Sequence, residues 1–305
     1  MELIKPDTHF DFVGKIRIAV LISATAVLIS LVSIIAHGGP NWGIDFAGGT
    51  VIQVKFQKDV PIDRIRGSLD AVNLSEVTIQ QFGARDENEY LIRTAESTED
   101  LKGLSGRIED SLAAAFGKDG YEVRRVEVVG PKVGKDLTQK GILAVVFSWI
   151  AMLVYIAWRF EFRFAVGGIL ALVHDTIITV GVLSLLRMEF SLVIVAALLT
   201  IIGYSINDTI VIYDRIRENM RKNIRQELAQ VVNASINQTL SRTILTVLTV
   251  VLVLISILVF GGAVIFDFAF AILVGVLVGT YSSIFIASPI VLAWERVSPS
   301  KRKRK

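Results

Sequence analysis

The stretch FSLVIVAALLTIIGYSINDTIVIY, residues 190–213, decides the fold class of this chain. It contains no Lys or Arg, and it is longer than the roughly 20 helical residues that cross the hydrocarbon core of a bilayer. Its only charged side chain is Asp208, which follows Asn207. The stretch therefore predicts a membrane-spanning helix that carries one carboxylate.

Five further stretches share this apolar character. The chain is 52% hydrophobic, above the roughly 45–50% of a typical soluble domain, and the excess is concentrated in blocks. The six predicted spans are Ile18–Ala36, Gly141–Trp158, Phe164–Leu186, Phe190–Tyr213, Thr243–Phe266 and Phe268–Trp294. The sequence thus predicts an α-helical membrane protein with six transmembrane helices, and the first span is expected to be a retained anchor.

Basic residues predict the orientation, because cytoplasmic loops of membrane proteins are enriched in Lys and Arg. With residues 1–17 inside, the two short outer loops contain only Arg187. Both termini are therefore expected in the cytoplasm. The tail, residues 295–305, ends in KRKRK; we interpret it as a topology or membrane-surface signal and not as a nucleic-acid site.

One soluble domain is expected between the first two spans, at residues 37–137. Its apolar pattern alternates as strands at 49–56, 77–83, 89–95 and 121–131, and it has helical spacing at 61–72 and 98–117. The predicted order is β-α-β-β-α-β, which is the α+β ferredoxin-like arrangement. The orientation puts this domain outside the cytoplasm.

The segment 214–242 interrupts the later spans, which occupy 138–294. It is charged first and amphipathic afterwards, so we expect a cytoplasmic helix that lies on the membrane face.

Enzyme motifs are missing from the sequence. The nearest approach to a phosphate-binding loop, GPKVGKD at 130–136, has the wrong glycine spacing and lacks the Ser or Thr. The chain has no Cys, and its three His residues are far apart in sequence. We therefore expect a transport subunit without a metal or an organic cofactor.

Ionisable residues inside the spans are the candidate functional residues. A charge at a helix centre costs at least about 2.5–3.5 kcal/mol, and His174, Asp175 and Asp208 all lie within apolar spans, while Arg242 begins the fifth. A desolvated carboxylate can cycle between charged and neutral forms, which suggests a proton path. The alternative is structural: buried polar groups join helices, and an Arg at a helix end extends to the headgroups.

Polar neighbours of Asp208 are the supporting candidates. Tyr204 and Ser205 share a helical face with Asp208, and Asn207 and Thr209 flank it.

Three motifs carry a resemblance to a known family. WGIDFAGGT (42–50) follows the first span, SINDTIVIYDRIREN (205–219) ends the fourth, and SINQTLSRT (235–243) begins the fifth. Together they resemble the SecD/SecF family of bacterial protein-export membrane proteins, and the second motif is typical of its SecF members. The resemblance covers the whole chain.

The resemblance implies a role beyond what composition indicates. Six spans would form half of a twelve-span bundle like that of RND exporters, completed by SecD, in the bacterial inner membrane. The pair would act with the SecYEG channel on a translocating preprotein, using the proton-motive force after SecA has acted, with protons as the coupling ion. In the family, the residues matching Asp208 and Arg242 are tied to proton movement; those matching His174 and Asp175 have a less certain role.

The WGIDFAGGT motif at residues 42–50, called the signature loop below, also has residues with predicted backbone roles. Gly43, Gly48 and Gly49 permit tight backbone approach or positive φ, and Asp45 is expected as a capping or turn residue.

Two alternatives stay open. The chain could be half of a proton-driven exporter of lipids or small molecules, although such exporters usually carry both halves in one chain. It could also be an assembly subunit without proton chemistry, which should tolerate Asp208→Asn.

Overall fold

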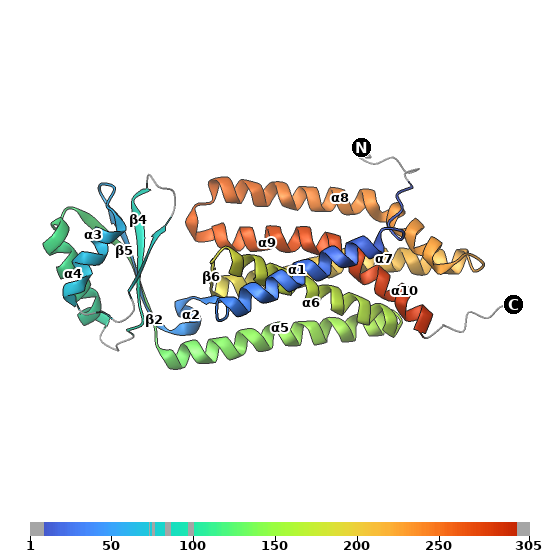
Figure 1. Cartoon of the computed structure of the whole chain (residues 1–305), viewed down its shortest axis with the longest axis horizontal. Helices are drawn as coiled ribbons and strands as arrows, with labels where there is room; N and C mark the ends of the chain where they lie inside the picture. The colour runs from blue at the N-terminus through green and yellow to red at the C-terminus, as the bar shows by residue number, and fades with distance from the viewer. Residues whose placement is uncertain (1–8, 73, 75–76, 83–86, 97–100, 298–305) are drawn as a thin grey trace.

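The computed structural model describes residues 9–72, 74, 77–82, 87–96 and 101–297. Long helices form a bundle, and a smaller α/β domain sits at one end of it (Figure 1). Both ends of the described chain lie at the opposite end of the bundle. We call the two ends of the bundle the domain side and the tail side. The basic residues 301–305 are outside the described residues.

Within the described chain, six helices are long and apolar enough to cross a membrane, which agrees with the predicted number. Their apolar windows contain at most two charged residues. The helices are α1 (Ile16–Ala36), α5 (Pro131–Arg159), α6 (Phe162–Leu185), α7 (Leu192–Lys222), α8 (Leu228–Phe260) and α9 (Ala263–Ser282), which continues through a π-helical turn (Ser283–Ala287) into α10 (Ser288–Val297).

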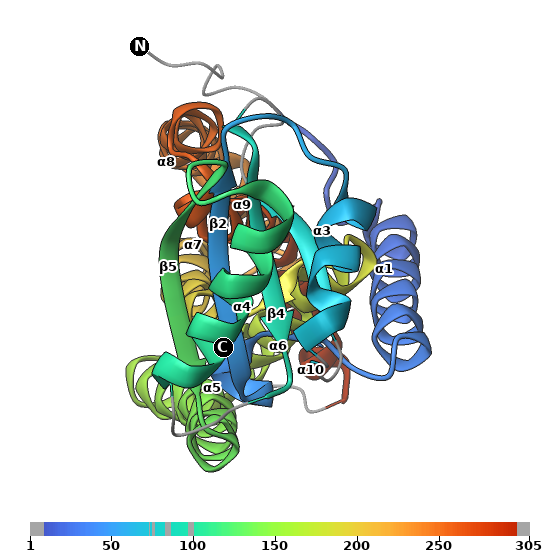
Figure 2. The ribbon, with the colours of Figure 1, turned by 90° about the vertical axis from the view of Figure 1, so that its left-hand side faces the viewer.

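The inserted domain is a four-stranded antiparallel sheet covered by two helices. Its strands are β2 (Gly49–Phe56), β3 (Thr78–Phe82), β4 (Glu89–Thr94) and β5 (Tyr121–Val129), in the spatial order β3-β4-β2-β5. Helices α3 (Ile62–Leu69) and α4 (Leu101–Phe116) lie on the sheet face that points away from the bundle (Figures 1 and 2). Because side chains alternate along a strand, Ile52, Ile92 and Ile79 lie in register on this covered face.

A polar layer divides the core of the helical bundle. One apolar cluster on the tail side includes Phe164, Tyr213 and Ile216, and another on the domain side includes Leu183 and Ile194. Between them, α6, α7 and α9 contribute buried polar side chains: Asp175, Thr176, Ser205, Asp208 and Ser282. Polar atoms in this position must find partners or pay for their desolvation.

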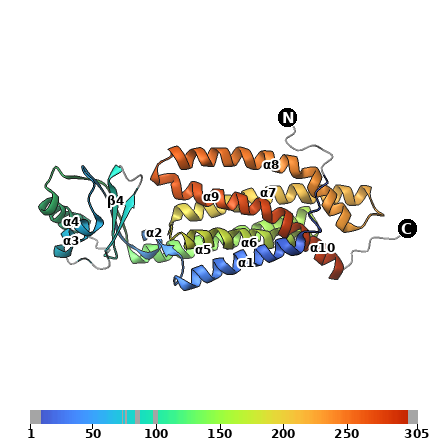
Figure 3. The same ribbon diagram turned by 45° about the horizontal axis from the view of Figure 1, so that its top comes forward.

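Short elements join the domain to the bundle. After α1, β1 (Asn41–Trp42) pairs in parallel with β6 (Glu189–Phe190), which lies between α6 and α7. A four-residue helix, α2 (Ile44–Ala47), then packs against α5. Figure 3 shows α2 between the sheet and the bundle.

The structure corrects the expected surface helix at 214–242. Helix α7 continues straight through its charged end to Lys222, and α8 already begins at Leu228, so the segment forms a hairpin of two helix ends that projects on the tail side (Figure 1). The apolar face of the segment packs within this hairpin: Ile216 and Val232 are both fully buried. An amphipathic pattern alone cannot tell a lipid surface from a neighbouring helix.

Two span boundaries also differ from the expectation. Helix α5 begins at Pro131, ten residues before the predicted start at Gly141, because the polar residues between them form a helical stalk beneath the domain. Helix α8 ends at Phe260, not at Phe266, because Gly261 and Gly262, the latter with φ +71°, turn the chain into α9.

Candidate functional site

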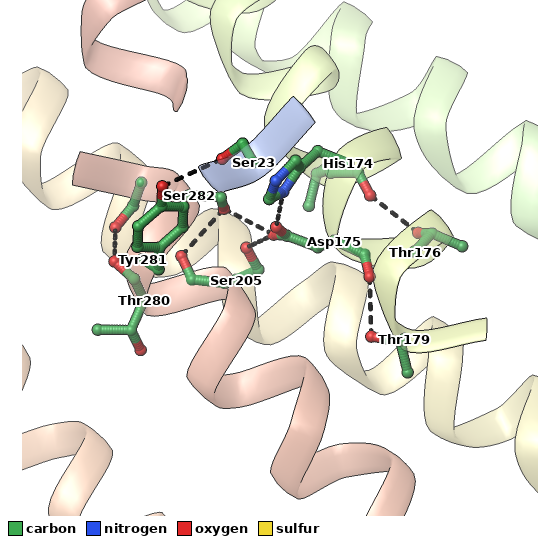
Figure 4. A network of polar contacts seen from close by, with 12 residues as sticks. Ser23, His174, Asp175, Thr176, Thr179, Ser205, Thr280, Tyr281 and Ser282 are labelled. Atoms are coloured by element: carbon green, nitrogen blue, oxygen red, sulfur yellow. Dashed lines mark hydrogen bonds and ion pairs between the residues drawn. The ribbon is translucent and has the colours of Figure 1, made fainter. Parts of the chain in front are cut away.

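The carboxylate of Asp175 has three polar partners in the bundle core. Its Oδ2 accepts hydrogen bonds from Ser205 Oγ at 2.7 Å and Ser282 Oγ at 2.9 Å. Its Oδ1 lies 3.0 Å from His174 Nδ1. Asp175 is 1% exposed, and Figure 4 shows these partners converging on it from α6, α7 and α9. Three bonds therefore hold one buried carboxylate between three helices.

A second set of contacts extends this cluster to α1. The ring of Tyr281 stacks on that of His174, with 6.4 Å between centroids. The hydroxyl of Tyr281 donates to the carbonyl oxygen of Ala19 at 2.6 Å and accepts from Ser23 at 3.2 Å. Nε2 of His174 is buried and has no hydrogen-bond partner among the described residues. The cluster thus joins four helices and leaves one ring nitrogen open.

The π-helical turn lies directly beside Ser282. It spans Ser283–Ala287, and the hydroxyl of Ser288 donates to the carbonyl of Ser283 at 3.0 Å. π-Helical turns inside α-helices are frequent at functional sites because they re-aim neighbouring side chains.

Asp208 lies in a different environment from Asp175. It is 6% exposed, and its carboxylate forms no hydrogen bond and no ion pair with the described residues. Arg242 on the facing helix α8 attracts it electrostatically without contact. Arg242 itself is exposed. The structure therefore brings Asp208 and Arg242 into the same region as a separated pair.

The predicted supporting residues divide between several roles. Ser205, one turn before Asp208, bonds Asp175. Tyr204 donates to the carbonyl of Thr246 on α8 at 3.4 Å, and Thr209 donates to the backbone of Ser205 at 3.4 Å. Asn207 is exposed on the surface of the bundle. None of the four forms a hydrogen bond with the carboxylate of Asp208.

Sequence reasoning missed the hydroxyls of Ser282, Tyr281 and Ser23. Hydroxyls occur throughout these spans, so their residue type alone gave no signal. The run GTYSS at 279–283 was the available hint, since it concentrates polar atoms in the sixth apolar span.

The signature loop builds the junction with the inserted domain. Oδ2 of Asp45 accepts a hydrogen bond from the backbone N–H of Leu192 at 2.9 Å, so Asp45 caps the first turn of α7. Gly48 and Gly49 have φ values of +77° and +124°. A Cβ on Gly49 would meet the carbonyl of Thr94, so both conformation and space require glycine there.

An ion pair crosses the same junction. Arg93 of β4 donates to Glu189 of β6, and thus ties the domain sheet to the loop before α7. Burial raises the pKa of the Glu189 carboxyl, the carboxylates of Asp267 and Asp45 add to the rise, and the guanidinium of Arg93 opposes it. This contact was not predicted from the sequence.

Comparisons with known proteins match this architecture. The family described as "Protein export membrane protein SecD/SecF, C-terminal" matches residues 108–297, and the "SecD/SecF GG Motif" matches residues 33–60. The protein translocase subunit SecF of Magnetococcus marinus is 48% identical over 100% of this chain and 97% of its own length. SecF of Vibrio alginolyticus is 43% identical over 95% of this chain and 91% of its own.

Two solved structures share the fold. SecDF of Thermus thermophilus, a translocon-associated membrane protein, superposes with a TM-score of 0.85 at 37% identity. The superposition covers 96% of this chain and 40% of the SecDF chain. A SecDF structure in a super-membrane-facing form gives a TM-score of 0.68 at 38% identity. Family models and full-length relatives agree, and the chain belongs to the SecD/SecF family as a SecF-type subunit of the protein translocase.

Proposed function

We propose that this chain, together with SecD, uses the proton-motive force to drive the late, post-SecA steps of preprotein translocation through SecYEG. The observation that carries the proposal is Asp208: a buried carboxylate in an apolar helix with no hydrogen-bond donor of its own among the described residues. An ionised group held there is costly. A proton that binds to and leaves Asp208 changes the balance of charge opposite Arg242, and with it the packing of α7 against α8.

The two buried acids are assigned different parts in this relay. Three bonds hold Asp175 in place, whereas Asp208 has none, so Asp208 is the better exchange site. Ser205 lies one helical turn from Asp208 and donates to Asp175. We assign His174 and Asp175 to the same relay through this hydroxyl.

The outward face of α7 around Asn207 supports SecD as the partner. Asn207 is exposed in a helix that would cross the membrane. Polar groups that face hydrocarbon are expensive, whereas a second subunit can pair them. We propose that the six spans of SecD cover this face and complete a twelve-span RND-like bundle.

The orientation follows from charge. The tail-side hairpin carries Arg215, Arg217, Arg221 and Lys222, so the tail side is assigned to the cytoplasm and the inserted domain to the outer side of a bacterial inner membrane. The β-α-β-β-α-β order and the strand order β3-β4-β2-β5 support a ferredoxin-like assignment for that domain.

The proposal is tested by preprotein release from spheroplasts that contain SecD and SecYEG, with and without an imposed proton gradient. Asp208→Asn keeps the size of the side chain but cannot exchange a proton at neutral pH. We expect the gradient to accelerate release in the native chain and to have no effect in Asp208→Asn.

Asp214→Asn is the matched control, because Asp214 lies on the same helix and pairs with Arg217 and Arg159 at the surface. Gradient-driven release should survive this change. Native behaviour of Asp208→Asn would remove the exchange site from this chain and favour an assembly subunit.

A further inference from the structure

A basic groove opens between the tail-side ends of α7 and α8, outside the polar layer. Its volume is about 710 Å³. Five cations line it: Arg215, Arg217, Arg221, Lys222 and Arg242. Figures 1 and 3 show the two helix ends side by side where they project from the bundle.

The two carboxylates in the groove are already neutralised. Glu218 pairs with Arg215 and Lys222, each at 2.7 Å. Asp214 pairs with Arg217 at 3.2 Å and with Arg159 at 3.5 Å.

Arg221 and Arg242 are the remaining cations of the lining, and neither forms an ion pair with a carboxylate among the described residues. The groove therefore keeps an excess of positive charge, with two guanidinium groups available for an anion. Guanidinium groups bind phosphate through paired N–H donors, which makes arginine well suited to phosphate recognition.

The groove lies where the apolar part of the bundle ends. Val211 lines it, and Tyr213 is the last residue before the charged end of α7. On α8, Arg242 is followed by the exposed apolar side chains of Ile244 and Leu248. An anion in the groove would thus have water on one side and lipid-facing apolar surface on the other.

We propose that this groove binds the phosphate headgroup of an anionic phospholipid. Arg221 and Arg242 hold the phosphate, Lys222 and Arg215 supply the surrounding positive charge, and the acyl chains lie along the exposed apolar face of α8. Basic pockets between membrane helices on the cytoplasmic side are suited to such headgroups. Bound lipid would also fix Arg242, the residue opposite Asp208.

Native mass spectrometry of the full chain, released from nanodiscs of mixed phosphatidylglycerol and phosphatidylcholine, tests the proposal. The native chain should retain phosphatidylglycerol selectively. Arg221→Gln/Lys222→Gln should weaken this retention about 30-fold, which corresponds to about 2 kcal/mol, because it removes a guanidinium that contacts the phosphate and a neighbouring cation of the groove. Both residues lie outside the proposed relay, and both are exposed.

Arg225→Gln/Arg296→Gln is the matched control, because it removes two exposed tail-side cations that do not line the groove. It should retain the lipid as the native chain does. An equal loss in both double variants would mean diffuse surface attraction, and no loss in Arg221→Gln/Lys222→Gln would mean that the groove is not the site; either result overturns the proposal.

Two competitors distinguish the lipid from other anions. Inorganic phosphate in excess over the lipid should leave phosphatidylglycerol bound, because it lacks the acyl chains. Displacement by inorganic phosphate would assign the groove to a free anion. Displacement by a short poly-glutamate peptide at concentrations below that of the lipid would assign it to an acidic protein segment.

Discussion

Asp175 and Asp208 show how hydrogen bonding divides two buried residues into different roles. Two hydroxyls donate to Asp175 and the ring of His174 bonds it as well, and hydrogen bonds in a low-dielectric core are strong. Such a carboxylate holds helices in place. Asp208, with only the distant attraction of Arg242, has nothing comparable to fix its charge or its position.

The bonds to Asp175 depend on a glycine in α9. A Cβ on Gly279 would lie 2.8 Å from Ser205 Oγ and 3.4 Å from Asp175 Oδ2. We expect Gly279→Ala to displace the Ser205 hydroxyl and to lower the free energy of unfolding by about 1–3 kcal/mol. Thermal unfolding of the purified chain in detergent, followed by circular dichroism, measures the change.

Gly203→Ala on α7 is the control, because no atom outside the adjoining turns of its own helix lies within 4 Å of the Cβ it would add. This variant should be as stable as the native chain or slightly more stable, since alanine favours a helix over glycine. Equal losses in both variants would show that the Asp175 cluster is not what makes position 279 sensitive.

The carboxyl of Glu189, which lies outside the spans, predicts that the stability of the folded chain depends on pH. Burial raises its pKa above the ordinary value of 4.5, against the opposing effect of Arg93. At a pH between 4.5 and the raised pKa, Glu189 keeps its proton in the folded chain but has lost it in the unfolded chain. The contribution of Glu189 to the free energy of unfolding is therefore fully present below pH 4.5 and is lost as pH rises through the raised pKa.

The expected result is a melting temperature that falls with rising pH in this window and a flatter profile in Glu189→Gln. The amide still offers Arg93 an acceptor oxygen. Glu122→Gln, on the exposed part of β5, should keep the native profile. An unchanged slope in Glu189→Gln would mean that other groups set the pH dependence.

At the scale of elements, the first turn of helix α7 is capped by a residue from a distant segment. Asp45 reaches across 147 residues of sequence to accept the N–H of Leu192. Loss of a cap costs about 0.5–2 kcal/mol. We expect Asp45→Ala to speed amide hydrogen exchange in the first turn of α7, measured by mass spectrometry.

Asp45→Asn should retain most of the protection, because its amide oxygen can accept the same bond. Equal protection in Asp45→Ala and in the native chain would mean that the Leu192 bond adds nothing to this helix end.

The element boundaries also show which parts of the fold can be predicted from the sequence alone. Six apolar blocks and the alternating strands were predictable, because apolar length and period follow directly from burial in lipid or behind a sheet. The hairpin at 214–242 was not, since an amphipathic face does not state what it packs against. The start of α5 at Pro131 was missed because its first residues are polar and leave no apolar signal.

The candidate site was predictable in its charged members and in Ser205, which was expected as a neighbour of Asp208 and not as a partner of Asp175. His174, Asp175, Asp208 and Arg242 stand out because charges are rare in apolar spans. Which hydroxyls bond Asp175 depends on how helices face one another, and no periodicity encodes that. The pairing of Arg93 with Glu189 joins residues 96 positions apart, and neither is unusual where it stands in the sequence.

At the scale of the whole molecule, the inserted domain has its own apolar core and meets the bundle through a small junction. The domain cluster, which includes Ile52 and Ile108, is separate from the two clusters in the bundle. The two SecDF forms cover nearly the same share of this chain at nearly the same identity, yet their TM-scores are 0.85 and 0.68. A difference of this kind is expected when parts of similar structure are arranged differently.

If the domain must move during translocation, holding it to the bundle should stop the motor. The chain contains no Cys, so a thiol pair can be introduced without interference from its own residues. Arg93→Cys/Glu189→Cys, joined by a short bifunctional thiol reagent, would link β4 of the domain to β6 of the bundle. We expect crosslinking to abolish gradient-driven preprotein release relative to the same variant before the reagent is added.

Lys55→Cys/Glu89→Cys provides the comparison, because this pair also replaces an ion pair, at 3.5 Å, but lies wholly within the domain. Its crosslink leaves the junction free and should leave release unchanged. Full release from the crosslinked junction variant would show that domain and bundle work as one rigid body. Proton-driven changes at Asp208 would then have to reach the preprotein through SecD, because α7, capped by Asp45, would have no moving domain to act on.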